Sequence, residues 1–278
     1  MITCLAILLA TASPIRTTAI IPSGFVALPK PPTHDDVECA SYSGVEWSVS
    51  APSGDLEVSA LARADAVDPL PFTYGRDPDR AGNRHALRMK DGWFAGFDAG
   101  EFGGGLWWFS SSTRQPVRVR PPHASSARDG AHLSENVRGF AQHPDGPLVF
   151  MGLDHLSGRS GHIFALRQAR GAWELQPFAV LDASPAAWVV SGDRAWVLTE
   201  SGLWEAAPGK PIRRLHELDV GSLYPTSMVL GSDDAIYAGM RRYVLRLQPV
   251  GARWVETWFV KSDCVRTRLN EYDCQCVP

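Results

Sequence analysis

Residues 193–204 read Asp-Arg-Ala-Trp-Val-Leu-Thr-Glu-Ser-Gly-Leu-Trp, and this stretch decides the fold because its pattern returns along the chain. A large apolar residue precedes Asp193 by five positions, an apolar run follows it after two residues, and a Gly opens a second apolar run. The same order of features surrounds Asp145 and Asp233, where an Arg replaces the Gly in the second case. A copy with a shorter first gap surrounds Asp91, so that successive Asp residues are 54, 48 and 40 positions apart. Repeats of this length indicate a solenoid, a propeller or an array of stacked units.

Each repeat is predicted to form four short strands separated by turns. In the third unit we expect strands at 186–191, 195–199, 203–206 and 211–215. The joints between them are Ser-Gly-Asp, Glu-Ser-Gly and Pro-Gly-Lys, which are strong turn signals. Four antiparallel strands per unit are typical of a propeller blade, in which radial repetition leaves only short sheet edges. The sequence therefore predicts an all-β fold, a β-propeller of four-stranded antiparallel blades.

The number of blades is predicted to be about five. Four units are clear, and residues 40–82 contain Glu-Trp-Ser-Val-Ser at 46–50 and Asp-Leu-Glu-Val-Ser at 55–59, which fit a degenerate first blade. Six blades and an incomplete ring are the alternatives, and residues 55–68 fit a short helix equally well. A helical repeat is excluded because 25 glycines and 21 prolines in 278 residues interrupt every candidate helix.

The run 193–204 resembles the repeat of two-component-regulator-type propellers, whose pattern is Asp, a turn Gly, an apolar-aromatic strand, Gly-Thr and Gly-Leu. Residues 143–152, His-Pro-Asp-Gly-Pro-Leu-Val-Phe-Met-Gly, are similar to the same repeat without its Thr. The resemblance covers about residues 86–260 and implies a blade. It implies no sensor role, because the blades are too few for the large sensor domains of that family and no kinase or transmembrane part follows.

The N-terminus predicts export. Residues 2–10 are apolar and end in Ala10-Thr11-Ala12, which is typical of a secretory signal peptide (residues 1–12) cleaved before Ser13. No Lys or Arg precedes the apolar run, so a buried N-terminal strand of a cytosolic protein is the alternative. Five prolines between 13 and 34 favour a semi-extended tether over 13–38, ahead of a propeller domain at 39–278. No stretch approaches the length of a membrane span, and we expect a periplasmic or secreted protein.

Removal of the signal peptide leaves four cysteines, and an even number in an exported chain favours disulfides. These are Cys39, Cys264, Cys274 and Cys276. A bond between Cys274 and Cys276 would be strained, so Cys39 is expected to reach one of them, with Cys264 taking the other. Such bonds link the two ends of the domain. A zinc site is the alternative, but the paired Cys-x-x-Cys spacing is absent, and neither a metal nor a cofactor is predicted.

A ligand site is predicted on one rim of the propeller. The gap between the Asp and the second apolar run is 14 and 16 residues in the first two units against 9 in the others, so two long insertions should emerge on the rim that carries the connections between blades. One such connection, residues 121–134, brings His123 and Arg128 there. The candidate site residues are Arg84, Asp98, Glu101, Arg138, Asp154 and His155. Pairing of Arg84 and Arg138 with the aspartates gives either structural salt bridges or a mouth that binds an anion or a sugar, since guanidinium forks match carboxylates and phosphates.

No catalytic motif is present. The eight histidines lack metal-ligand spacing, and there is no Gly-x-Ser-x-Gly elbow, phosphate loop or dinucleotide fingerprint. Trp93, Trp188, Trp196 and Trp204 occupy repeat positions typical of packing between sheets, and only one of Trp107 and Trp108 can face the core. A net charge of −3 without a basic stripe argues against nucleic-acid binding.

The sequence favours a non-catalytic exported propeller that binds a partner protein or a small ligand. The alternatives are a periplasmic hydrolase or lyase with its site at the mouth of the channel, and a tethered subunit of an envelope assembly. The residues of the binding or active site determine the function, which does not follow from the fold.

Overall fold

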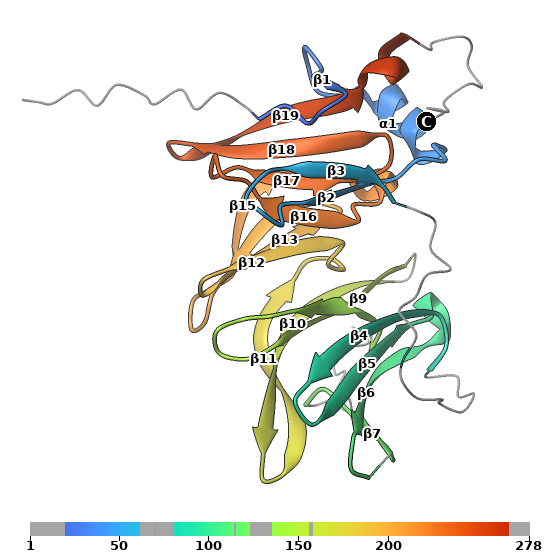
Figure 1. Cartoon of the computed structure of the whole chain (residues 1–278), viewed down its shortest axis with the longest axis vertical. Coiled ribbons are helices and arrows are strands. Elements are labelled where there is room, and N and C mark those ends of the chain that lie inside the picture. Colours follow the sequence, from blue (N-terminus) through green and yellow to red (C-terminus); the bar gives the residue numbers. More distant parts are fainter. Residues whose placement is uncertain are drawn as a thin grey trace, which may run out of the picture.

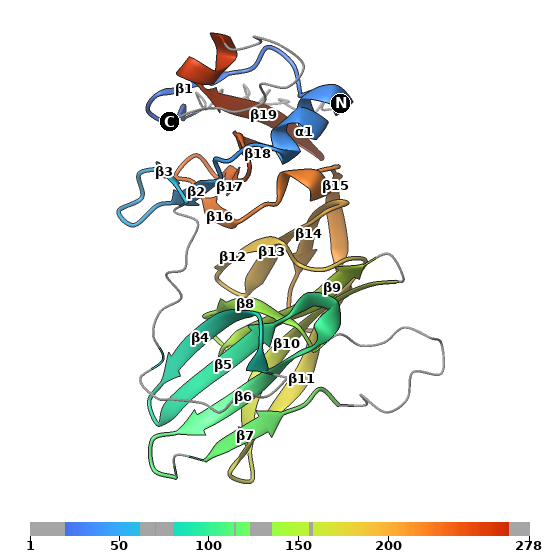
Figure 2. The same cartoon turned by 90° about the vertical axis from the view of Figure 1, so that its right-hand side faces the viewer.

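The computed structural model describes residues 20–61, 70, 80–113, 115–122, 135–155 and 158–266. Within them the chain forms five antiparallel sheets that follow one another along the length of the molecule (Figure 1, Figure 2). The predicted signal peptide, the connection with His123 and Arg128, and two of the cysteines, Cys274 and Cys276, lie outside the described residues.

Three sheets are four-stranded meanders in which each strand pairs with the next one along the chain. The first contains β4 (Asn83–Met89), β5 (Gly92–Asp98), β6 (Gly104–Ser110) and β7 (Pro116–Val119). The second contains β8 (Val137–Ala141), β9 (Leu148–His155), β10 (Gly158–Ala169) and β11 (Ala172–Leu181). The third contains β12 (Ala187–Ser191), β13 (Arg194–Thr199), β14 (Gly202–Ala206) and β15 (Arg213–Glu217). These sheets are the blades that the repeat predicts, and the fold class is confirmed.

The last blade has a fifth strand that comes from the other end of the chain. Its own strands are β16 (Ser227–Leu230), β17 (Ile236–Gly239), β18 (Tyr243–Val250) and β19 (Arg253–Lys261), and β1 (Phe25–Ala27) pairs with β19. The segment 13–38, expected as a tether, is therefore packed onto the domain from β1 onward. The physical reason is Phe25, which is buried and meets Trp47 edge-on, with the ring centroids 5.0 Å apart.

In the described part of residues 40–82, the degenerate first blade is a hairpin of two strands, β2 (Trp47–Ser50) and β3 (Glu57–Ala60). It packs beside the last blade, where the Trp47 N–H donates to the Met240 carbonyl and Ser227 Oγ accepts from the Val49 N–H. Helix α1 (His34–Ser41) precedes the hairpin and begins at a capping box formed by Thr33 and Asp36. Residues 57–60 are a strand, so the helical alternative for this stretch is wrong there.

The sheets form an open arc and not a closed ring, which was one of the expected alternatives. In both views β4–β7 lies at one end of the arc and the last blade at the other, with the hairpin β2–β3 beside the last blade (Figure 1, Figure 2). Apolar side chains fill the space between neighbouring sheets, as where Trp188 stacks on Phe150 with ring centroids 4.2 Å apart. Trp108 is buried, while its neighbour Trp107 is half-buried beneath the guanidinium of Arg80.

Two short 3₁₀ turns lie on the side of the sheets where the blades connect, η2 (Gly100–Phe102) and η3 (Gly221–Leu223), and a third, η4 (Ser262–Arg266), follows β19. The two insertions expected as long loops take different forms. In the first blade the extra residues form η2, whereas in the second they lengthen β9 and β10 into one long hairpin. The strands before these insertions carry an aspartate at or near their ends. β5 ends at Asp98, and Asp154 is the last but one residue of β9, so the candidate site lies at these strand ends.

Candidate ligand-binding chamber

A cavity of about 760 Å³ opens where the inner strands of all five sheets converge. Each sheet contributes to its lining, by a residue within a strand or directly beside one. One such residue from each sheet is Glu46, Asp98, Arg138, Trp188 and Thr226. Three of the six predicted site residues, Asp98, Arg138 and Asp154, line this chamber.

Arg138 reaches the chamber because β8 carries a β-bulge at this position. Val137 pairs with Met151 and Gly139 pairs with the adjacent Phe150, so Arg138 has no partner across the strand pair. A bulge of this kind turns a side chain away from the regular alternation of the sheet. Gly139 makes it possible: its φ is 153°, and a Cβ there would lie 2.6 Å from the Trp188 ring. The glycine thus admits both the bulge and the tryptophan.

Asp98 holds Arg138 in place. Its Oδ2 accepts a hydrogen bond from the Arg138 guanidinium at 2.5 Å, and its Oδ1 accepts one from the Gly100 N–H at 3.0 Å. The buried Asn136 fixes the turn that follows, since its side chain accepts from the Ala99 N–H and donates to the Gly100 carbonyl. The expected pairing of Arg138 with Asp98 is present, and side-chain hydrogen bonds hold this part of the rim.

Asp154 stands across the chamber with a different environment. Its Oδ1 accepts from the Ser184 N–H at 2.8 Å, and among the described residues it has no ion pair. Desolvation by the chamber walls raises the pKa of Asp154, and the Glu200 carboxylate raises it further, against the opposing effects of the Ser184 N–H and of two arginines. This carboxyl group is the one that a ligand can engage without breaking an existing ion pair.

The charges of the lining favour cations over anions. Four carboxylates line the chamber, and three of them are paired: Glu46 with Arg241 at 2.8 Å, Asp98 with Arg138, and Glu200 with Arg159. Counting these partners, the lining carries one more carboxylate than guanidinium. A small anion entering the chamber would therefore meet a net negative wall.

His85, Trp188 and Tyr224 supply the flat surfaces of the chamber. Burial and the Arg138 charge lower the pKa of His85, partly offset by Asp98, so the imidazole is neutral at pH 7. The Trp188 indole N–H donates to the Phe140 carbonyl at 3.3 Å, which leaves its ring edge fixed against Gly139. Tyr224 lies under the Arg241 guanidinium at 3.9 Å and is 53% exposed, so one face of its ring is open.

The other three predicted residues do not line the chamber. Arg84 is half-buried in β4, where strand alternation turns its neighbours Asn83 and His85 to the cavity in its place. Glu101 lies exposed on η2, and His155 ends β9 opposite Gly158. Arg84 and Arg138 do occupy matching positions in their strands, but only Arg138 stands on a bulge.

Sequence reasoning missed the residues that the last blade and the first hairpin bring to the chamber, Glu46, Tyr224 and Thr226. Tyr224 has the left-handed conformation, with φ 50°, directly after η3. Nothing in the repeat pattern marks these positions, because they lie in connections and not in the repeated strands. Within the described ranges, no group of three or more His, Cys, Asp or Glu side chains is arranged to hold a metal ion. The same residues include no helix long and apolar enough to cross a membrane.

Comparisons with known proteins give no family. No protein family matches the chain, and no curated protein matches it by sequence. Among solved structures, it is similar to the extracellular domain of a candidate one-component system from B. thetaiotaomicron, with a TM-score of 0.44 and 11% identity over 76% of this chain and 26% of that one. It is also similar to a candidate 6-phosphogluconolactonase from Bacteroides uniformis, with a TM-score of 0.40 and 11% identity over 80% of this chain and 68% of that one.

A third similar structure is a streptogramin B lyase, with a TM-score of 0.34 and 14% identity over 65% of this chain and 66% of that one. The chain thus spans about a quarter of the first of these proteins and two thirds of the other two. At these TM-scores the likeness carries no argument about ligand or activity.

Proposed function

We propose that the protein is a non-catalytic β-propeller-type binding protein that holds a small ligand in the chamber. The observation that carries the proposal is the convergence of all five sheets on one cavity of about 760 Å³ with a mixed polar and aromatic lining. Cavities of roughly 300–1,000 Å³ with a few well-placed polar groups are typical of small-molecule sites. A purely structural gap between sheets would be closed by apolar side chains, as it is where Trp188 stacks on Phe150.

The lining favours a ligand rich in hydrogen-bond donors, either hydroxyl groups or an ammonium group. Asp154 and the free lone pairs of Glu46 and Glu200 are acceptors, and the excess of one carboxylate favours a positive group. The anion predicted from the arginine forks is less well supported, because Arg138 is paired with Asp98 and the lining as a whole has an excess of one carboxylate. The open ring of Tyr224 provides a face for the apolar side of such a ligand.

Three sugars that share one ring and differ in charge test this proposal: glucosamine, glucose and glucuronate. We expect each to shift the Trp188 indole N–H signal in NMR spectra, assigned with Trp188→Phe, in the order of affinity glucosamine, glucose, glucuronate. Asp154→Asn should remove the advantage of glucosamine, whereas Asp145→Asn, an exposed aspartate outside the chamber, should not. Tightest binding of glucuronate would contradict the proposed ligand chemistry.

The same titration has a defined pH dependence. Since the pKa of Asp154 is raised above its ordinary value of 3.8, the carboxylate is protonated at a higher pH than an exposed aspartate. Binding of glucosamine should therefore weaken as the pH falls through that raised pKa, while binding of glucose changes less. The Asp154→Asn variant should show the same affinity for both sugars across this range.

A hydrolase or lyase at the same chamber is the second candidate, and one observation favours it. Asp154 has a raised pKa and lies close enough to Glu200 for that carboxylate to contribute to the rise. A carboxyl group with a raised pKa beside a second carboxyl group is an arrangement that general acid–base chemistry uses. Release of nitrophenolate from 4-nitrophenyl glucosaminide, abolished by both Asp154→Asn and Glu200→Gln, would replace the binding proposal with this one.

We further propose that the protein is exported to the periplasm or beyond. The support is the apolar run 2–10 with its Ala10-Thr11-Ala12 end and the even number of cysteines that remain after cleavage. N-terminal sequencing of protein purified from its host should begin at or near Ser13. Recovery of an intact Met1 from the cytoplasm would contradict export.

A further inference from the structure

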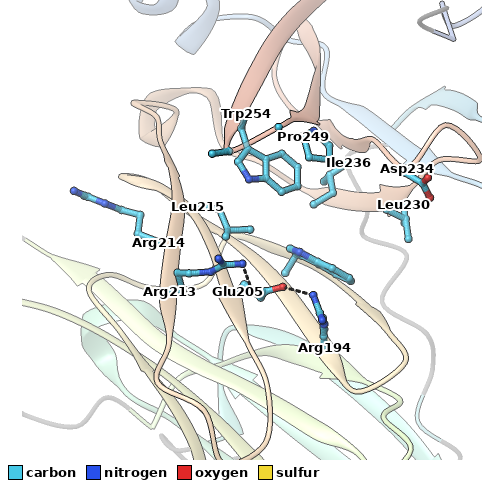
Figure 3. A pocket seen from close by; sticks show the side chains of 13 residues that line it. Arg194, Glu205, Arg213, Arg214, Leu215, Leu230, Asp234, Ile236, Pro249 and Trp254 are labelled. Carbon is cyan, nitrogen blue, oxygen red and sulfur yellow. Dashed lines mark hydrogen bonds and ion pairs between the residues drawn. The ribbon is translucent and has the colours of Figure 1, made fainter. Parts of the chain in front are cut away.

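A second cavity of about 470 Å³ lies between the sheet β12–β15 and the last blade (Figure 3). It shares no lining residue with the chamber. Arg194 and Trp196 in β13 face this cavity, whereas Glu200, directly after the end of that strand, faces the chamber. The two cavities therefore lie toward opposite ends of β13, and we call the second one the interblade cleft.

One side of the interblade cleft is apolar and only partly covered. The last blade contributes Ile236 and Trp254, seen at the top of Figure 3, and the opposite sheet contributes Trp196 and Leu215. Trp196, Leu215 and Trp254 are half-buried: each packs on the core shared by the two sheets and still lines the cleft. Two tryptophans and neighbouring aliphatic side chains thus present flat apolar walls to whatever enters.

The other side carries a net positive charge. Glu205 lies between two arginines: its Oε1 accepts from Arg194 at 3.0 Å and its Oε2 from Arg213 at 2.7 Å (Figure 3). Two guanidinium groups therefore share the Glu205 carboxylate. Over the whole lining, three arginines exceed the two carboxylates, Glu205 and Asp234, by one, and Arg194 Nε also lies 3.9 Å from Asp193 Oδ1. Each guanidinium has five N–H donors, and one from each is used in these contacts. Arg214 points away from this cluster in Figure 3, so it does not add to it.

We propose that the interblade cleft binds a small amphipathic anion, a carboxylate carried on a flat apolar or aromatic body. The apolar body lies against Trp196 and Trp254, and the carboxylate receives the unused N–H groups of Arg194 and Arg213. The charge complementarity is local, since the whole chain carries a net charge of −3. Arginine is suited to this role because its planar fork matches a carboxylate and stays charged at all working pH values. The inference does not depend on a ligand in the chamber.

The test uses two probes of the same shape, naphthalene-2-carboxylate and its neutral amide, on the full chain at low salt. Indole N–H signals are followed by NMR and assigned with the single variants Trp196→Phe and Trp254→Phe. We expect the carboxylate to shift both signals and to bind about 10-fold or more tightly than the amide, as for a hydrogen bond to a charged group. Arg213→Gln should reduce this preference to about 2-fold or less while the affinity for the amide stays the same.

The matched control is Arg253→Gln, because Arg253 is exposed beside Trp254 and does not line the cleft. It removes the same charge from the residue next to Trp254, whose side chain points to the other face of β19, and should leave the preference for the carboxylate unchanged. The proposal is overturned if neither indole signal moves at about 10 mM carboxylate. It is equally overturned if the two probes bind alike, or if Arg253→Gln acts as strongly as Arg213→Gln. Arg213 is 66% exposed and contributes no core packing, so loss of folding is not expected for its variant.

Discussion

At the scale of single residues, the position of Arg138 depends on the glycine beside it. Gly139 has φ 153°, and an added Cβ would meet the Trp188 ring at 2.6 Å. No L-residue fits there unless the bulge of β8 or the tryptophan moves. The chamber thus depends on a particular backbone conformation at Gly139 as well as on its charged side chains.

Gly139→Ala should lower the free energy of unfolding by about 1–3 kcal/mol, because strained backbone and a clash are added together. The measurement is urea unfolding followed by tryptophan fluorescence. The matched control is Gly192→Ala, a turn glycine with φ 58° and no heavy atom near an added Cβ, which should cost less. If the two variants lose the same free energy of unfolding, the clash with Trp188 does not contribute to the loss.

Asp233 gives the stability of the last blade a pH dependence. Its side chain is 6% exposed, and its Oδ2 accepts from Arg246 at 2.8 and 3.0 Å and from the Tyr237 hydroxyl at 3.0 Å. Burial alone would raise the pKa of Asp233, but these hydrogen bonds and the Arg246 charge outweigh it, and the pKa lies below 3.8. The folded protein therefore binds this proton less readily than the unfolded chain does. The resulting stabilisation is full above about pH 4 and is lost as the pH falls through the folded pKa.

Asp233→Asn should consequently destabilise the protein by about 3–5 kcal/mol at pH 7, since it leaves a buried guanidinium without its partner. The difference from the unmodified protein should narrow below about pH 4. Unfolding in urea at a series of pH values measures both. The neighbouring Asp234→Asn, at an exposed position, should change neither quantity. A constant difference down to the lowest pH would contradict the assigned ion pair.

At the scale of elements, the short strand β1 joins the N-terminal segment to the last blade. It is three residues long, and its hold depends on Phe25, which is 8% exposed against Trp47. Phe25→Ala should cost about 3 kcal/mol, as for a large-to-small change in a core. Val26→Ala, next to it but 38% exposed, should cost well under 1 kcal/mol. Hydrogen exchange of the β19 amides should become faster in the first variant and not in the second.

The strands of the repeats could be predicted from the sequence, whereas β1 and the composition of the chamber could not. β12–β15 match the predicted strands closely, because Gly and Pro turn signals separate apolar runs with a period of two. β1 lies among prolines, and its three residues are too few to show the alternating pattern that predicts a strand. Asp98, Arg138 and Asp154 were found because they repeat between two blades. Arg84 occupies the position in its repeat that Arg138 occupies in the next one. Only Arg138 lies on a bulge, which the sequence does not reveal, and therefore only Arg138 faces the cavity.

At the scale of the whole molecule, the described sheets form a linear series. The sheet β4–β7 packs on β8–β11, and the last blade receives both β12–β15 and the hairpin β2–β3. The first and last described segments of the chain therefore meet on the last blade, since β1 pairs with β19 and Ala40 of α1 shares a core with Cys264. In a series of units that contact only their neighbours, stability is close to a sum of local terms, and a link between the ends acts on the unfolded chain.

The cysteines are placed to provide such a link. Cys39 lies on α1 and Cys264 on η4, and the expected pairing of Cys39 with Cys274 or Cys276 involves residues outside the described range. A bond from Cys39 to Cys274 or Cys276 closes a loop of more than 200 residues, and loop-entropy arguments then assign about 4 kcal/mol or more to the bond. Non-reducing peptide mapping should find Cys39 in a linked peptide, and reduction should lower the urea midpoint with little change in the native tryptophan spectrum. Replacement of Cys39 by Ser should reproduce that loss, and reduction should then add little to it. If Cys39 is a free thiol in exported protein, or if its replacement leaves the midpoint unchanged, contacts on the last blade alone hold the two ends together.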